Sequence, residues 1–230
     1  MIASLCWYPA ARPAWDRLWT GLRARLGWGP DHLTWPQEFG RHWRDPDLVL
    51  SMTCALPMRL GLAGEVALVG SPIWDLPGLP PGHYASHLVQ RAEDTRGVEE
   101  AAAAGLAINA EDSQSGHGAL RDAGLHGPRT VTGSHAASMA AVAGGQAHLA
   151  AIDAVTWTLA PHPGLRVART TPPTPSTPFI TARPDWRAPV RAALADAIRA
   201  MPAEDRTATK LIGVVDLPGT PYAADLARTA

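Results

Sequence analysis

Short apolar runs alternate along the chain with segments that place apolar side chains at helical spacing. The runs at 2–6, 47–54 and 65–74 predict buried strands. Between the first two, tryptophans and leucines recur every three or four residues, which predicts a helix over 13–28 with its arginines on the opposite face. The first part of the chain therefore mixes strands with at least one amphipathic helix.

The middle of the chain repeats a strand-then-helix order. After a strand near 84–93, we expect a strand ending 101–109, a helix opening within 115–124, a strand at 129–133, a helix at 134–145, a strand at 147–153 and a helix at 154–160. Alternation of this kind predicts an α/β fold, with helices on both faces of a sheet. A last strand at 179–181 and an alanine-rich helix over 189–201 follow.

Two proline- and glycine-rich stretches divide the chain, one near Gly82 and one near Pro175. They enclose a middle lobe, so the flanking segments must pair to make the other lobe. We therefore predict a discontinuous lobe 1 at 1–83 plus 176–230 and a lobe 2 at 84–175. Lobe interfaces are common places for small-ligand clefts, and a cleft is expected there.

Two hydroxyl-rich turns each precede a predicted helix in the middle lobe. The first contains Ser113, Ser115 and Gly116, and the second contains Ser134 and His135. Hydroxyls and free backbone N–H groups at a helix start form an anion site, which the helix dipole favours. A nearby anion would raise the pKa of His135, which could add a positive charge or a proton. Ordinary helix capping by serine remains the alternative.

Composition removes several classes of function. The chain has 230 residues and a net charge of −1, so it has no basic field for nucleic acid. Lys210 is the only lysine and lies far from the serine-rich turns, which disfavours Schiff-base chemistry. Cys6 and Cys54 suggest neither a disulfide framework nor a zinc pattern.

Targeting signals are also absent from the pattern. There is no run of eighteen apolar residues, so no membrane insertion is expected. The segment 1–10 lacks the features of a signal peptide. As written, the sequence predicts a cytoplasmic protein, and a periplasmic one if the natural chain begins further upstream.

Catalytic and metal alternatives have weak support. A serine hydrolase needs a nucleophile, a histidine base and an acidic partner. The G-x-S-x-G pattern is absent, and His117 and Asp153 would complete a triad only by accident of folding. His83 and His87 are four residues apart but lie in a predicted loop and strand, not a helix. We therefore expect no catalytic residue, metal or cofactor.

The segments INAEDSQSGHGALR, TGSHAASMAAVAGGQAHLAAIDAVTW and TPPTPSTPFIT together resemble the phosphate, phosphite and phosphonate substrate-binding proteins of ABC transporters. The earlier segments DLVLSMTCALP and LVGSPIWD are similar in order and spacing to that family's first lobe. The resemblance implies a two-lobe, type 2 periplasmic-binding-protein fold with the ligand in a cleft between the lobes. It spans nearly the whole chain.

The resemblance also implies which residues hold the ligand. In the middle lobe it implicates both turns, through Ser113, Ser115, Gly116, Ser134 and His135. From the first lobe it adds side chains at or after the strand ends: Tyr8, Ser51, Thr53, Trp74 and Tyr84. Packing or strand-end hydrogen bonding is the alternative role of each first-lobe residue.

Asp153 is ambiguous, since it could cap the helix that follows or pair with the ammonium of an aminophosphonate. The function expected is capture of a small oxyanion by a monomer that delivers it to ABC-transporter membrane subunits. A cytoplasmic ligand sensor, or an enzyme of small metabolites on the same fold, is the alternative.

Overall fold

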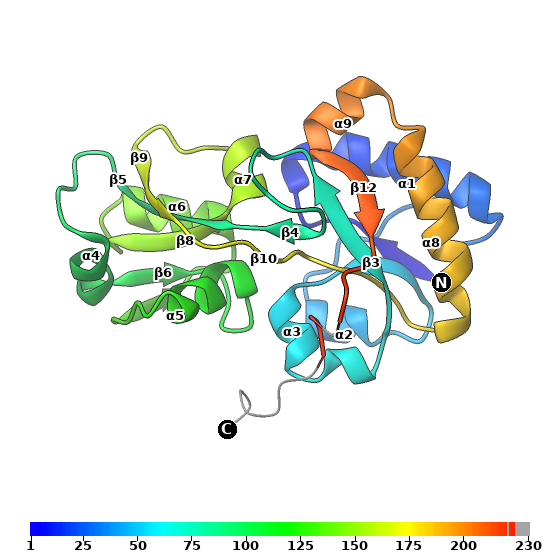
Figure 1. The fold of residues 1–230 in the computed structure, drawn as a ribbon, viewed down its shortest axis with the longest axis horizontal. Coiled ribbons are helices and arrows are strands. Elements are labelled where there is room, and N and C mark those ends of the chain that lie inside the picture. The colour runs from blue at the N-terminus through cyan, green and yellow to red at the C-terminus, as the bar shows by residue number, and fades with distance from the viewer. Residues whose placement is uncertain (220, 224–230) are drawn as a thin grey trace. The chain divides into compact units, whose positions relative to one another are not determined.

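The computed structural model describes residues 1–219 and 221–223, and it divides the chain into two units. Unit 1 comprises Met1–His83 and the chain from Pro175 onward, and unit 2 is Tyr84–Thr174 (Figure 1). The sequence analysis placed the second boundary one residue later. Its lobe 1 also included 220 and 224–230, which lie outside the described residues.

Unit 1 is built on a five-stranded sheet in the order β1-β2-β11-β3-β12. Strands β1 and β2 are parallel, whereas β11 runs antiparallel to both β2 and β3, and β12 runs antiparallel to β3. Its strands are β1 (Ile2–Ser4), β2 (Leu48–Met52), β3 (Ala67–Trp74), β11 (Phe179–Thr181) and β12 (Leu211–Val215). Its helices are η1 (Pro9–Ala11), α1 (Arg12–Leu26), α2 (Phe39–Trp43), α3 (Ala55–Arg59), η2 (Leu62–Gly64), α8 (Pro184–Arg199) and α9 (Ala203–Thr209).

Helices cover the sheet of unit 1 on both faces. Helix α8 packs on the central strands and has α1 beside it (Figure 1). Trp15 and Trp19, both almost fully buried, lie in this layer. A second apolar cluster includes Trp43 of α2, Met58 of α3 and Ile180 of β11. The amphipathic pattern over 13–28 thus produces α1, whose apolar face is buried as predicted.

Unit 2 has a five-stranded sheet in the order β7-β6-β8-β5-β9. Strand β6 is parallel to β7 and β8, while β5 is antiparallel to β8 and β9. Its strands are β5 (Ser86–Arg91), β6 (Leu106–Ile108), β7 (Arg129–Val131), β8 (Leu149–Asp153) and β9 (Leu165–Thr170). Its helices are α4 (Val98–Ala104), the π-helical turn η3 (Gln114–Gly118), α5 (Ala119–Asp122), α6 (His135–Ala143) and α7 (Ala154–Leu159). Short strands β4 (His83–Tyr84) and β10 (Thr174–Pro175) pair where the chain passes between the units.

Neighbouring residues of the unit 2 strands point to opposite faces of the sheet. Leu106 and Ile108 pack with α4 and α5, whereas Ala107 packs with α6. Because both faces are apolar, each must be covered by helices. The α/β fold class predicted from the strand-helix alternation is confirmed.

Some elements differ from the sequence expectations. The helix expected over 189–201 begins at Pro184, and Pro189 is accommodated inside it. The predicted helix within 115–124 starts as the π-helical turn η3, a feature often found at functional sites. Helix α9 and strand β12, which the sequence analysis did not anticipate, complete unit 1.

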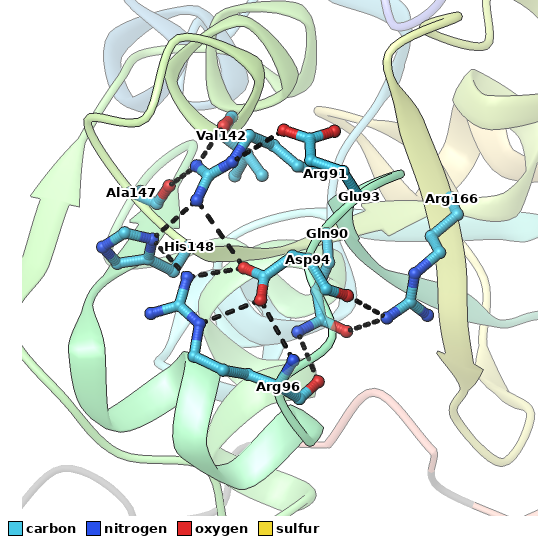
Figure 2. Close-up of polar contacts among 9 residues, drawn as sticks. All are labelled: Gln90, Arg91, Glu93, Asp94, Arg96, Val142, Ala147, His148 and Arg166. Carbon is cyan, nitrogen blue, oxygen red and sulfur yellow. Dashed lines mark hydrogen bonds and ion pairs between the residues drawn. The ribbon is translucent and has the colours of Figure 1, made fainter.

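A buried polar network in unit 2 surrounds Asp94, whose side chain is 5% exposed (Figure 2). Arg96 donates to its two carboxylate oxygens at 2.9 and 2.5 Å, and Arg91 lies 3.6 Å away. Both guanidinium groups also face Nδ1 of His148, at 3.2 Å from Arg91 and 2.8 Å from Arg96, so this nitrogen accepts hydrogen bonds. The bonds from Arg96 hold the pKa of Asp94 well below its usual range. The network fixes the turn after β5 to the segment before β8.

Replacing Asp94 by Asn should lower the free energy of unfolding by about 1–3 kcal/mol, because the partly buried guanidinium groups of Arg91 and Arg96 lose a charged acceptor. Since its folded pKa is depressed, the wild-type contribution should be fully present above about pH 4 and fall as the solution becomes more acidic. Urea unfolding measures the difference. Glu93→Gln is the matched control, because Glu93 is 74% exposed although it lies 3.4 Å from Arg91. Equal stability of the two variants would contradict the role of Asp94.

Candidate functional site

Three strand ends of unit 2 place helix starts at one edge of its sheet. Strands β6, β7 and β8 are parallel, so their carboxyl ends lie together. The chain turns there into η3, α6 and α7 respectively. Backbone N–H groups at helix starts attract anions, and ligands of open α/β sheets bind at this edge. The two hydroxyl-rich turns predicted from the sequence therefore lie on the same side of unit 2.

The His135 imidazole joins these turns. Its Nε2 lies 2.9 Å from Oγ of Ser115 in η3 and 3.4 Å from Oδ2 of Asp153 at the end of β8. The side chains of His135 and Asp153 are 13% and 4% exposed. Residues that are far apart in the sequence thus meet in a single, largely buried cluster.

The position of the hydrogen on His135 follows from its neighbours. A carboxylate only accepts hydrogen bonds, so Asp153 beside Nε2 favours a hydrogen on that nitrogen. Ser115 can then accept from the ring and keep its own hydroxyl hydrogen for another acceptor. Burial lowers the pKa of His135, although the Asp153 carboxylate acts to raise it. The structure therefore favours a neutral imidazole, which donates a hydrogen bond through its N–H group, over a charged imidazolium.

This arrangement differs from a catalytic triad. In a triad the serine and the carboxylate bond opposite nitrogens of the imidazole, so that one nitrogen is free to remove the serine proton. Here Ser115 and Asp153 both face Nε2 of His135. The three side chains therefore lack the arrangement of a catalytic triad.

The remaining predicted residues of unit 2 cap the helix starts. Ser113 Oγ accepts from Gly116 N at 3.1 Å, and Ser134 Oγ accepts from Ala137 N at 3.1 Å. Asp153 Oδ1 accepts from Thr156 N at 2.9 Å, and its Oδ2 accepts from the Thr156 hydroxyl. The capping role considered for these residues is therefore present. A serine that accepts a capping bond still has its own hydrogen to donate.

Gly116 packs closely in the first turn. A Cβ atom at this position would lie 1.9 Å from Oδ1 of Asn109, which is buried. Only glycine leaves room for the Asn109 side chain, which follows β6 directly. The sequence analysis did not select Asn109, although its place after a strand end was a usable signal.

In unit 1, Tyr8 and Trp74 form an aromatic pair. Their ring centroids are 5.3 Å apart in an edge-to-face arrangement, and both are 4% exposed. Tyr8 also stacks on Trp15, whose Nε1 donates to the Tyr8 carbonyl at 3.2 Å. Trp74 Nε1 donates to Ser176 Oγ at 2.6 Å. The structure thus brings two of the predicted first-lobe residues into contact.

Hydroxyl groups lie at the carboxyl end of β2. Thr53 is fully buried, and its backbone N donates to Pro178 O at 3.0 Å, next to Thr177. Within the described residues, the hydroxyls of Thr53 and Thr177 are both buried without a hydrogen-bond partner. Such groups are costly unless something else satisfies them, which suits a ligand-binding role. Thr177 was not selected from the sequence, because only the antiparallel pairing of β11 with β2 in the fold brings its neighbour Pro178 to Thr53.

Ser51 and Tyr84 have a different environment. Ser51 Oγ lies 3.2 Å from His42 Nε2 and donates to Met52 O, so its hydroxyl already has partners inside unit 1. Tyr84 is 1% exposed on β4. Ligand contact by either residue stays a prediction.

Comparison with known proteins decides the family. A family profile described as the periplasmic substrate-binding protein of phosphonate ABC transporters matches residues 77–217, more than half of the chain. The chain belongs to this family. No curated protein sequence matches it significantly. The resemblance seen in the sequence is confirmed.

Solved structures share the fold of this phosphonate-binding family member. PhnD1 from Prochlorococcus marinus, in complex with methylphosphonate, matches with a TM-score of 0.71 and 13% identity over 96% of this chain and 93% of that chain. A binding component of a Pseudomonas aeruginosa ABC phosphonate transporter matches with 0.68 and 11%, over 92% and 78%. XAC2383 from Xanthomonas citri, bound to ATP, matches with 0.68 and 14%, over 96% and 91%. These identities support the type 2 periplasmic-binding-protein fold alone.

Family membership bears on location and chemistry. The family is periplasmic and consists of substrate-binding proteins, so it lends no support to a cytoplasmic location. No helix in the described part of the chain is long and apolar enough to cross a membrane. Among the described residues, no group of three or more His, Cys, Asp or Glu side chains could hold a metal ion.

The buried imidazole predicts a pH dependence. Because the folded pKa of His135 is below its usual value near 6.5, the unfolded chain binds more protons as the pH falls below that value. His135→Gln should reduce the slope of unfolding free energy against pH by up to about 1.4 kcal/mol per pH unit below pH 6.5. Urea unfolding at a series of pH values measures it.

Ser138→Ala is the control for this experiment. Ser138 lies on α6, as His135 does. The substitution removes a buried hydroxyl, which is bonded to Thr132 at 2.7 Å, but no titrating group. It should lower stability while leaving the pH slope unchanged. A slope for His135→Gln that equals the wild-type slope would contradict burial of a neutral imidazole.

Proposed function

We propose that the chain is a solute-binding protein that captures a small oxyanion, a phosphonate, phosphite or phosphate ester, for an ABC transporter. The observation that carries the proposal is the convergence of Ser115, His135 and Asp153 at the helix starts of unit 2. In this proposal Ser113, Ser115, Gly116, Ser134 and His135 surround the oxyanion. Delivery to membrane subunits from the periplasm follows from the family to which the chain belongs.

The chemistry of the cluster suits an anion. With the ring hydrogen of His135 on Nε2, Ser115, at 2.9 Å, accepts from the ring and is left with a hydroxyl hydrogen to donate to a ligand oxygen. The starts of η3 and α6 add backbone N–H groups and the favourable ends of their dipoles. Neutral donors therefore balance the ligand charge, and no covalent step is needed.

Unit 1 supplies the second group of proposed contacts. The buried hydroxyls of Thr53 and Thr177 are donors for oxyanion oxygens. Tyr8 and Trp74 offer an apolar surface for the carbon substituent of a phosphonate. Ser51 of unit 1 remains a proposed contact from the resemblance alone, and so does Tyr84, which is the first residue of unit 2 and not part of unit 1.

Asp153 has a double role in the proposal. Its two oxygens cap α7, and it orients the His135 ring. Pairing with the ammonium of an aminophosphonate would add a further bond to the same carboxylate. An Asp153→Asn variant that weakens binding of 2-aminoethylphosphonate much more than binding of methylphosphonate would support that pairing.

Ligand class is tested by calorimetric titration and thermal shift with phosphate, phosphite, sulfate, methylphosphonate and 2-aminoethylphosphonate. A ligand present at 100 times its Kd should stabilise the protein by about 2.7 kcal/mol. Binding of a phosphorus oxyanion and no change in the compound afterwards is the expected result. Turnover of the compound would instead favour an enzyme, and a response to none of them would contradict the proposed ligand class.

Replacing Ser115 and His135 together by Ala should raise the Kd for the bound oxyanion by about 10- to 100-fold, because the Ser115 bond to the ligand is lost and a charge-assisted hydrogen bond contributes ~1.5–3 kcal/mol. Titration calorimetry on the folded variant measures the change. Thr207→Ala is the control, because it removes an exposed hydroxyl from α9 that donates to Ala203 O. Unchanged affinity in the double variant would refute the assignment of these turns.

A further inference from the structure

Tyr222 lies near the end of the described chain and is buried in unit 1. Its side chain is 3% exposed and packs with Trp43, Met58 and Ile180. The segment before it is held in place because Arg59 Nε donates to Pro221 O at 3.2 Å. Tyr222 is therefore an integral part of this apolar cluster.

The Tyr222 hydroxyl has a defined direction. It donates to the carbonyl oxygen of Ser176 at 2.8 Å. Because that bond uses its single hydrogen, the contact with Ser71 Oγ at 2.7 Å must be a bond that Ser71 donates. Burial raises the pKa of Tyr222, which keeps the hydrogen in place. The chain of donors runs from Ser71 through Tyr222 to Ser176.

Ser176 connects this chain to the aromatic pair. It is fully buried, its backbone N donates to Gly82 O at 2.9 Å, and its Oγ accepts from Trp74 Nε1 at 2.6 Å. Ser71 and Trp74 are both on β3, so the hydrogen bonds form a closed loop with that strand. Tyr222 thereby bonds the main-chain carbonyl of Ser176, and Trp74 bonds its side-chain hydroxyl.

We propose that Tyr222 is a positioning residue for the ligand site, which holds Ser176 so that its hydroxyl fixes the Trp74 indole against Tyr8. This rests on the proposed function, in which Tyr8 and Trp74 contact the ligand. Through these hydrogen bonds Tyr222 acts on the aromatic pair of Tyr8 and Trp74, and Tyr222 itself does not contact the ligand in this proposal.

A double-mutant cycle tests the effect on binding. Tyr222→Phe keeps the ring and removes the hydroxyl, and it should raise the Kd for the best-bound phosphonate about three- to tenfold. In a Trp74→Phe background, which lacks the indole N–H, the same change should have little further effect. Thr181→Val is the control, since it removes another buried hydroxyl of unit 1, bonded to Leu48 O at 3.1 Å. It should lower stability and leave the Kd unchanged.

A second measurement does not depend on any ligand. The Trp74 indole N–H resonance, assigned by its loss in Trp74→Phe, should exchange with solvent at least about tenfold faster in Tyr222→Phe than in the wild type or Thr181→Val. Unchanged exchange in Tyr222→Phe, or an equal loss of affinity with and without the Trp74 indole, would overturn the role of Tyr222. Failure of the proposed function would look different. In that case Ser115→Ala would leave the affinity for the phosphonate unchanged, while the indole N–H of Trp74 would still exchange faster in Tyr222→Phe.

Discussion

The imidazole of His135 lies 2.9 Å from the Ser115 hydroxyl and 3.4 Å from the Asp153 carboxylate, and the candidate site of unit 2 depends on this contact. It joins the π-helical turn after β6, the start of α6 and the end of β8. A carboxylate and a hydroxyl both face Nε2 of the buried imidazole, whereas Nδ1 is buried without a hydrogen-bond partner. A hydrogen on Nε2 leaves Ser115 able to donate, which is the property an oxyanion site requires.

The same contact distinguishes the cluster from a catalytic triad. Serine, histidine and aspartate are all present, but the serine and the carboxylate face one ring nitrogen, whereas in a triad they bond opposite nitrogens. Capping by Ser113, Ser134 and Asp153 further fixes the helix starts, so the backbone donors are ordered by the fold itself.

Much of the architecture could be predicted from the sequence because strands and helices alternate regularly along unit 2. Apolar runs such as 147–153 predicted strands, and the parallel order predicted that Ser115 and His135 would lie at one edge. The contact between His135 and Asp153 could not be predicted, because residues on adjacent turns meet or miss by the direction of single side chains. Thr177 and Tyr222 escaped prediction for a similar reason. Their partners, β2 and Ser71, are distant in sequence, and neither residue lies in a periodic pattern.

The central claim is that ordered hydroxyl and backbone donors of this chain bind a phosphorus oxyanion. A crystal structure of the protein with methylphosphonate tests it most directly. We expect phosphonate oxygens within about 3 Å of Ser115 Oγ and of backbone nitrogens at the starts of η3 or α6. A phosphonate bound with no contact to Ser115 or these helix starts would contradict it.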